Sequence, residues 1–227
     1  MNEVNWRFPG NSYASEQGLD TSDMETFKKD PIASLAREIC QNSIDARKDF
    51  SKPVIVEFNS FEIKTEDIPG KARLLEEVVS CQNYWSYHEK IHKQLGEMNK
   101  TLSKQVTKCL RISDFNTTGL KGVRDDKRSG WYLLTKGSGV SDKVGSSGGS
   151  KGIGKFATFV ASEFNTVFYS TLNEDGEIAY QGITKLCSTI IAGSREKTIG
   201  IGYYTDSLEN TPIIADFSLD DSFKRVE

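Results

Sequence analysis

Two short segments, far apart in the chain, constrain its fold and chemistry more than any other feature. Residues 37–46 read Arg-Glu-Ile-Cys-Gln-Asn-Ser-Ile-Asp-Ala, a helical pattern that carries acid and amide side chains. Residues 148–157 read Gly-Gly-Ser-Lys-Gly-Ile-Gly-Lys-Phe-Ala, a glycine-rich turn that leads into a helix. A carboxylate that can activate water, an amide that can hold a metal ion and a turn that can cradle phosphate are the minimum parts for cleaving a nucleotide. Together the two segments predict nucleotide chemistry.

The composition is that of an ordinary, slightly polar globular protein. At 227 residues, with 37% hydrophobic and 27% charged residues, the chain can bury a sizeable core. A net charge of −3 argues against a dominant nucleic-acid-binding surface, although a local basic patch remains open. No apolar run approaches the ~20 residues that span a bilayer. The four cysteines form no close pair, so we expect reduced thiols, a cytoplasmic location and no membrane partner.

The first segment belongs to a helix with a clear start. Asp30 is a good N-cap residue and Pro31 suits the first turn, so a helix is expected to run to about Asp49. Glu38, Asn42 and Asp45 lie on a flank of this helix, beside its apolar side. The apolar side comprises Ile32, Leu35, Ala36, Ile39, Cys40 and Ala46.

The remaining pattern predicts an α+β fold, a two-layer sandwich with a mixed, mostly antiparallel sheet and helices on one face. Two helices are expected in the charged, helix-favouring segment 71–108, and one more at 156–161. A long loop at 121–150, with a short helix at most, is typical of a functional lid. Strands are expected at 54–58, 109–114, 166–170, 178–184 and 200–204, with a hairpin turn at 173–176.

Glu38, Asn42 and Asp45 are spaced i, i+4 and i+7, so they share one helix face. Glu38 could act as a general base for water, and Asn42 could offer an oxygen ligand to Mg²⁺. The alternative is a solvated helix face with a chance pattern, because amphipathic helices carry such stripes routinely.

The segment Asp114-Phe-Asn-Thr-Thr-Gly119 follows a predicted strand. A carboxylate at a strand end can accept a hydrogen bond from an exocyclic amine such as that of adenine, and the following Asn and Gly permit a sharp turn. The alternative is an ordinary turn built on the Asp and Asn side chains.

The glycine-rich segment 149–155 can present backbone N–H groups to phosphate oxygens at a helix N-terminus. Its alternative is a flexible linker. The segment also spells the start of a Walker A loop, GxxxxGK. It departs from that motif because Phe156 stands where Ser or Thr should hold Mg²⁺, and no buried strand precedes it.

These elements, in this order, resemble the GHKL ATPases, the family of DNA gyrase, MutL, the large heat-shock chaperone and the sensor histidine kinases. The pattern Glu38-x-x-x-Asn42-x-x-Asp45-Ala46 is similar to the family's N box. Residues 114–119 resemble its first glycine box, and residues 149–154 match the GxxGxG of its second. The resemblance covers about residues 30–190 and extends to a bacterial subgroup often tied to phage defence.

The resemblance implies a Bergerat fold, with ATP held between helices and a lid. It implies Glu38 as the general base, Asn42 as the Mg²⁺ ligand and Asp114 as the acceptor for the adenine amine. Asn116 stands where the first glycine box usually has Gly, which leaves the backbone path under the adenine open. The other implied nucleotide contacts are Asp45, Asn116, Gly119, Gly149, Lys151, Gly152, Ile153, Gly154, Lys155 and, as a strand threonine near adenine, Thr184.

The resemblance also implies how the chain is organised. We expect residues 1–227 to form a single ATP-binding domain, with a helical insertion at about 70–108 and a lid at about 120–150. A fragment of a longer protein is expected, with other domains as partners and an ATP-dependent homodimer. Glu38 favours hydrolysis over a histidine-kinase role, so the expected activity is an ATPase that works as a nucleotide-driven conformational switch.

Three alternatives remain at this point. The chain could bind nucleotide without hydrolysing it, or it could be a nucleic-acid-binding scaffold. It could also be a zinc peptidase, because His88-Glu89-Lys90-Ile91-His92 matches HExxH. The neighbouring lysines and the lack of a third histidine count against zinc.

Overall fold

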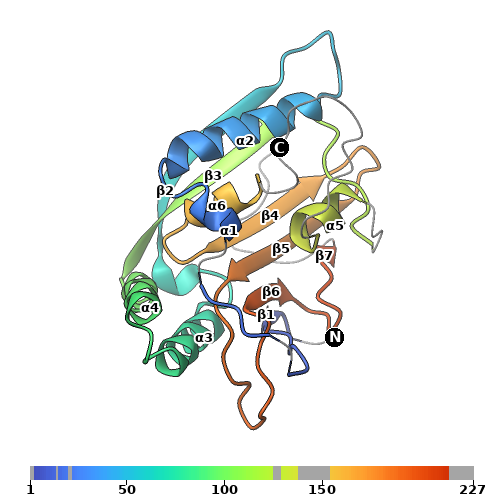
Figure 1. Cartoon of the computed structure of the whole chain (residues 1–227). Coiled ribbons are helices and arrows are strands. Elements are labelled where there is room, and N and C mark those ends of the chain that lie inside the picture. Colours follow the sequence, from blue (N-terminus) through green and yellow to red (C-terminus); the bar gives the residue numbers. More distant parts are fainter. Residues whose placement is uncertain (1–2, 14, 20–21, 125–128, 138–153, 215–227) are drawn as a thin grey trace.

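The computed structural model describes residues 3–13, 15–19, 22–124, 129–137 and 154–214 (Figure 1). Within this part of the chain, no helix is long and apolar enough to cross a membrane. The elements in chain order are β1 (Asn5–Arg7), α1 (Ser22–Glu25), α2 (Pro31–Asp45), β2 (Ile55–Lys64), the 3₁₀ turn η1 (Thr65–Asp67), α3 (Lys71–Tyr84), α4 (Glu89–Leu102), β3 (Val106–Phe115), α5 (Gly130–Thr135), α6 (Phe156–Val160), β4 (Thr166–Leu172), β5 (Ile178–Lys185), β6 (Ile201–Thr205) and β7 (Ile213–Ile214).

The larger sheet has the strand order β1-β6-β5-β4, and β7 pairs with β5. Strands β4 and β5 form the predicted hairpin, in a register from Thr166 opposite Thr184 to Leu172 opposite Ile178. Its turn is held by the Asn173 side-chain oxygen, which accepts hydrogen bonds from two backbone N–H groups of the turn at 3.0 Å each. Such self-bonding is why Asn favours turns, and the expected hairpin is confirmed.

Strands β2 and β3 form a separate two-stranded antiparallel ribbon of ten residues each. The strands are about twice as long as the sequence predicted. Their pairing is continuous from Ile55 opposite Phe115 to Lys64 opposite Val106. The expectation of one mixed sheet is wrong for the described residues, where there are two sheets and every strand pairing is antiparallel. A cavity of about 820 Å³ is lined by β3 on one side and β4 on the other.

Helix α2 begins as predicted. The Asp30 carboxylate accepts a hydrogen bond from the Ala33 N–H at 3.2 Å, and Pro31 occupies the first turn. The helix ends at Asp45 rather than Asp49, because the Ala46 carbonyl accepts from Thr118 N–H at 2.9 Å instead of continuing the helix. Placing Ile32 on the buried side was also wrong, since this side chain is 63% exposed.

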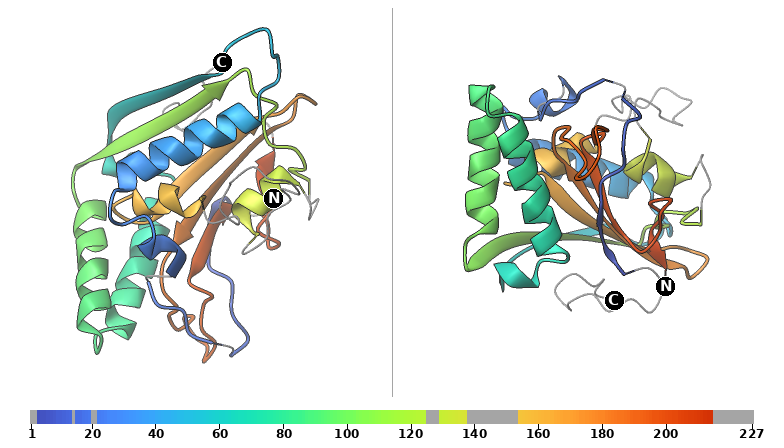
Figure 2. Two further views of the ribbon diagram at one scale, coloured as in Figure 1. Left: turned by 45° about the horizontal axis from the view of Figure 1, so that its top comes forward. Right: turned by 90° about the horizontal axis from the view of Figure 1, so that it is seen from below.

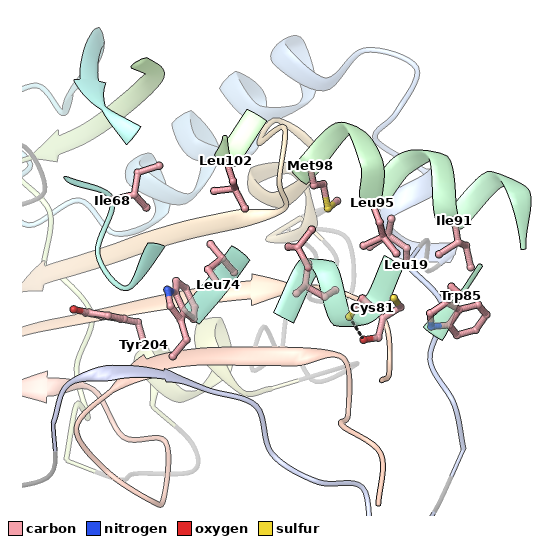
Figure 3. Packing of buried hydrophobic residues seen from close by; sticks show 14 of the residues in the cluster. Leu19, Ile68, Leu74, Cys81, Trp85, Ile91, Leu95, Met98, Leu102 and Tyr204 are labelled. Atoms are coloured by element: carbon pink, nitrogen blue, oxygen red, sulfur yellow. Dashed lines mark hydrogen bonds between the residues drawn. The ribbon is translucent and has the colours of Figure 1, made fainter. Parts of the chain in front are cut away.

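The segment expected to be an insertion consists of the two helices α3 and α4, which pack against each other and against the larger sheet (Figure 3). Leu74 on α3 and Leu95 on α4 are fully buried in one cluster with Tyr204 of β6. The Trp85 indole N–H, just beyond α3, donates to the Ser188 carbonyl at 2.8 Å. The helix pair is therefore part of the main core.

Helices α1, α2, α5 and α6 lie on one side of the larger sheet, whereas α3 and α4 stand at one end of it (Figures 1 and 2). Contacts join α6 to α1, α2 and β4, so α6 is the centre of the helical layer. This arrangement bears out the coarse α+β class. The sequence missed β1, α1 and β7, which have two to four residues each and are too short for a periodic pattern.

Replacing Leu95 by Ala should lower the free energy of unfolding by about 2–5 kcal/mol, because the side chain is fully buried between α3 and α4. Leu208→Ala is the matched control, and its effect should stay within about 0.5 kcal/mol since that leucine is 76% exposed. Urea unfolding of both variants measures the difference. Equal stabilities would show that the helix pair is not part of the cooperative core.

Candidate functional site

The carboxylate of Glu38 lies against Gly154, the described glycine of the glycine-rich segment. A Cβ placed on Gly154 would stand 2.7 Å from Glu38 Cδ and still closer to Glu38 Oε2. Real Cβ atoms essentially never come so near to another heavy atom, so any side chain at residue 154 would push the Glu38 carboxylate aside. The two motifs that are 116 residues apart, from 38 to 154, thus converge in the fold.

The same helix also holds the carboxylate at the end of β3. Ser43, a buried residue of α2, donates its hydroxyl hydrogen to the Ile39 carbonyl at 2.9 Å and shares it, in a longer bifurcated hydrogen bond, with Asp114 Oδ2 at 3.3 Å. This bond occupies one Asp114 oxygen and leaves Oδ1 as a further acceptor. Sequence reasoning missed Ser43, although a serine on the apolar side of an amphipathic helix is a signal that it has a specific partner.

Asn116 fixes the loop that follows α2. Its side-chain N–H₂ donates to the Asp49 carbonyl at 2.9 Å, and its side-chain oxygen accepts from Asp49 N–H at 3.0 Å. The residue has a positive φ of 60°, which Asn tolerates better than most residues. The Asn116 amide that we predicted as a nucleotide contact is thus engaged with the 49–53 backbone.

Gly119 is required by close packing. Its φ is +66°, and a Cβ there would stand 2.8 Å from the Asn173 Cα of the β4–β5 turn. The first glycine segment therefore lies against the hairpin turn, and Leu120 N–H confirms the contact by donating to the Thr171 hydroxyl at 2.8 Å.

The cavity between β3 and β4 reaches Asp114 at one end and has Leu35 and Ile39 of α2 in its lining. Its volume of about 820 Å³ is within the range of ligand pockets, which is roughly 300–1,000 Å³. Neither Glu38 nor Gly154 lines this cavity. Asp114 is consequently the predicted site residue that faces the cavity, whereas the Glu38–Gly154 contact lies outside its lining.

Asn42 and Asp45 are exposed on α2. Asp45 accepts a hydrogen bond from Gln41 Nε2 at 2.8 Å. Asn42 lies one turn from Glu38 and, among the described residues, its side chain has no hydrogen-bond partner. An oxygen donor beside a carboxylate on one helix face suits a hard cation such as Mg²⁺, which typically takes few protein ligands together with phosphate oxygens and water.

Lys155 holds the end of α5, the short helix within the predicted lid. Its ammonium donates to the Leu133 carbonyl at 2.9 Å and to the Gly137 carbonyl. Cations suit the C-terminal end of a helix, where carbonyl groups lack partners. Burial lowers the pKa of Lys155 to about 8.

Thr184 is fully buried on β5, where its hydroxyl accepts from the Thr166 hydroxyl at 2.9 Å. Thr166 lines the cavity next to β3, whereas Thr184 does not. Of the two, Thr166 is the threonine with access to a ligand in the cavity. Gly149, Lys151, Gly152 and Ile153 lie outside the described residues.

The two histidines of the HExxH pattern serve separate local roles. His88 caps the start of α4, where its Nδ1 accepts from Ile91 N–H at 3.4 Å. His92 Nδ1 lies 3.0 Å from the Gln82 carbonyl oxygen. Within the described ranges there is no group of three or more His, Cys, Asp or Glu side chains that could hold a metal ion. The zinc alternative therefore gains no support.

Comparison with known proteins adds no further evidence. No protein-family model matches the chain, and no curated protein or solved structure matches it significantly.

Lys185, at the end of β5, is a second half-buried lysine near α6. Its ammonium lies 4.8 Å from the centre of the Phe156 ring and 5.2 Å from that of Phe159. Burial, with a smaller contribution from the Lys155 ammonium, lowers the pKa of Lys185 to about 8, and Asp23 opposes this shift. The fold thus disfavours the charged form of Lys185 relative to the unfolded chain.

The free energy of unfolding should rise with pH above 8 because of Lys185. Between its folded pKa of about 8 and its ordinary value of 10.5, the unfolded chain binds more protons at this residue, so raising the pH relieves a cost of the folded state. From pH 8 to pH 10 the gain is on the order of 2 kcal/mol. Denaturant unfolding of the wild type and Lys185→Met, each at several pH values, measures it.

Subtracting the free energy of unfolding of Lys185→Met from that of the wild type at each pH removes the contributions that other titratable groups make equally to both proteins. The stability difference between them should shrink as the pH rises. A difference that stays constant from pH 8 to pH 10 would contradict the assigned cause.

Proposed function

We propose that this chain binds ATP and hydrolyses it with Mg²⁺, as a nucleotide-driven switch of the GHKL type with a Bergerat fold. The observation that carries the proposal is the contact between the Glu38 carboxylate and Gly154. It brings a candidate base to the glycine-rich segment, while the same helix binds Asp114 through Ser43. One helix thus connects the candidate adenine acceptor with the candidate phosphate region.

The proposed roles follow from the position of each group. Glu38 takes a proton from the attacking water, and the backbone near Gly154 holds the phosphates. Asp114 accepts the exocyclic amine of adenine through Oδ1, since Oδ2 already accepts from Ser43. Asn42 would hold Mg²⁺, which when bound neutralises charge on the phosphate oxygens during their displacement.

The switch in this proposal is α5. Lys155 bonds the C-terminal carbonyls of α5 and directly follows the glycine-rich segment. If a phosphate group takes Lys155 as its partner, α5 loses two hydrogen bonds and can be repositioned. Lid movement of this kind is a common way for nucleotides to control a fold. An ATP-dependent homodimer, further domains of a longer chain and a role in antiviral defence are part of the same proposal.

Glu38→Gln should lower phosphate release by roughly 10²–10⁴-fold, which is the typical contribution of a positioned acid or base. Binding of a non-hydrolysable ATP analogue should persist, because the amide has nearly the same shape as the carboxylate. Phosphate release and calorimetric titration measure the two effects. Equal release by both proteins would exclude Glu38 as the base, and no release from the wild type despite analogue binding would favour the alternative, a nucleotide-binding module without hydrolysis.

Asp114→Ala should abolish the rise in melting temperature that an ATP analogue with Mg²⁺ gives to the wild type. Ser43→Ala is the matched control, because it removes the hydrogen bond to Asp114 and leaves the carboxylate in place. The control should keep its response to nucleotide at a somewhat lower melting temperature. A normal response in Asp114→Ala would exclude this residue as the adenine acceptor.

Gly154→Ala should displace the Glu38 carboxylate, since a Cβ there would stand 2.7 Å from Glu38 Cδ. We expect phosphate release to fall to the level of Glu38→Gln while the fold persists. Gly18→Ala is the control, because its Cβ would meet only Ile91 Cδ1 at 3.6 Å. Full activity in Gly154→Ala would show that the contact has no catalytic role.

A further inference from the structure

A second, smaller cavity lies where α5, α6, β5 and β6 meet. Its volume is about 180 Å³, and its lining includes Lys155, Lys185, Asp23 and Tyr203. Neither Asp114 nor Glu38 lines it. The cavity is therefore distinct from the one between β3 and β4, and a ligand other than a nucleotide can be considered for it.

The lining carries an excess of positive charge. Lys136, Lys155 and Lys185 contribute ammonium groups, and Asp23 contributes the single carboxylate among the described lining residues. Lys136 directs its ammonium to the Glu209 carbonyl at 3.0 Å, and Lys155 bonds the end of α5. Lys185 remains as the cation that these bonds leave uncommitted.

Lys185 is a half-buried cation beside aromatic rings. Among the described residues no hydrogen bond or ion pair is formed by its ammonium, which lies over the two phenylalanine rings of α6 and interacts electrostatically with Asp23 and Lys155. An ammonium group has three donors, which favour oxygen acceptors. Aromatic faces attract an ammonium but accept no strong hydrogen bond.

We propose that this cavity binds a small tetrahedral oxyanion, of the size of inorganic phosphate or sulfate, through Lys185 and the neighbouring Lys155. Such an anion accepts hydrogen bonds from Lys185 and offsets the repulsion between the two ammonium groups. The cavity is smaller than the roughly 300 Å³ at which pockets for drug-sized ligands begin, so a whole nucleoside does not fit. The inference shares Lys155 with the proposed function, where a nucleotide phosphate would take its ammonium, but the proposed base, adenine acceptor and metal ligand do not line this cavity.

Binding of the anion should depend on pH in a defined direction. The lysines bind an anion in their charged form, and burial lowers the pKa of each to about 8. The other titratable groups that face the site are Asp23, Lys136 and Tyr203, with Tyr132 close to Tyr203; burial raises the pKa of Tyr203 to about 12, so it stays neutral. Affinity should consequently fall as the pH rises through 8.

The test is calorimetric titration of the full chain with sodium sulfate, whose charge is constant over the range, in an amine buffer with NaCl holding the ionic strength. Saturable binding at pH 7 should weaken by at least about tenfold by pH 9, which is the effect of one lysine with a pKa of about 8, and by more if both lysines lose their protons. Inorganic phosphate should compete with sulfate for the site. Sulfate binding should persist in Asp114→Ala, which removes the proposed adenine acceptor outside this cavity, so that a failure of this site and a failure of the proposed nucleotide site are distinguishable.

Three variants decide the outcome. Lys185→Met should lose sulfate binding, and Lys185→Arg should keep it with a weaker pH dependence, because Arg stays charged. Lys100→Met is the control for general charge, since that lysine is exposed on α4 and pairs with Glu97. Circular dichroism establishes that each variant is folded. Absence of saturable binding in the wild type, unchanged binding in Lys185→Met or an equal loss in Lys100→Met would overturn the proposal.

Discussion

The position of α2 between the end of β3 and Gly154 sets the relative places of the candidate groups. In the middle of the helix the Ser43 hydroxyl lies 3.3 Å from Asp114 Oδ2. One turn further along, α2 ends where Ala46 and Lys48 bond to the backbone at Thr118 and Asn116, and at its other end Asp30 caps the helix. With α2 fixed at these points, the Glu38 carboxylate lies where a Cβ on residue 154 would displace it.

Two half-buried lysines form the second physical theme of this fold. Lys155 directly precedes α6 and Lys185 lies over its Phe156 ring, and burial lowers the pKa of both to about 8. Lys155 donates to two carbonyl groups of the α5 segment, whereas Lys185 contacts aromatic faces and interacts electrostatically with Asp23. Keeping two such cations near each other lowers the free energy of unfolding, and binding of a negatively charged ligand can offset that loss.

Local signals in the sequence predicted much of this structure. The Asp30 cap, the Asn173 turn and the periodic pattern of α3 and α4 depend on residues close in sequence, so the start of α2, the hairpin and the helix pair are confirmed. The end of α2 was placed four residues too late, because it is decided by Thr118 and Asn116, more than 60 residues away along the chain.

The same distinction applies to the site. The stripe of Glu38 and Asn42 could be read from helical spacing, but the Ser43–Asp114 bond and the Lys155 contacts with α5 depend on tertiary packing. The separation of β2–β3 from the larger sheet is likewise tertiary, since each strand pattern is compatible with either arrangement. Sequence reasoning therefore found the chemistry-bearing residues more readily than their partners.

The most direct test of the central claim is a crystal structure of this chain with a non-hydrolysable ATP analogue and Mg²⁺. The account predicts the adenine amine within hydrogen-bond distance of Asp114 Oδ1 and the terminal phosphate between Glu38 and the backbone at Gly154. An analogue that is well ordered elsewhere, with neither Asp114 nor Glu38 in contact, would contradict it.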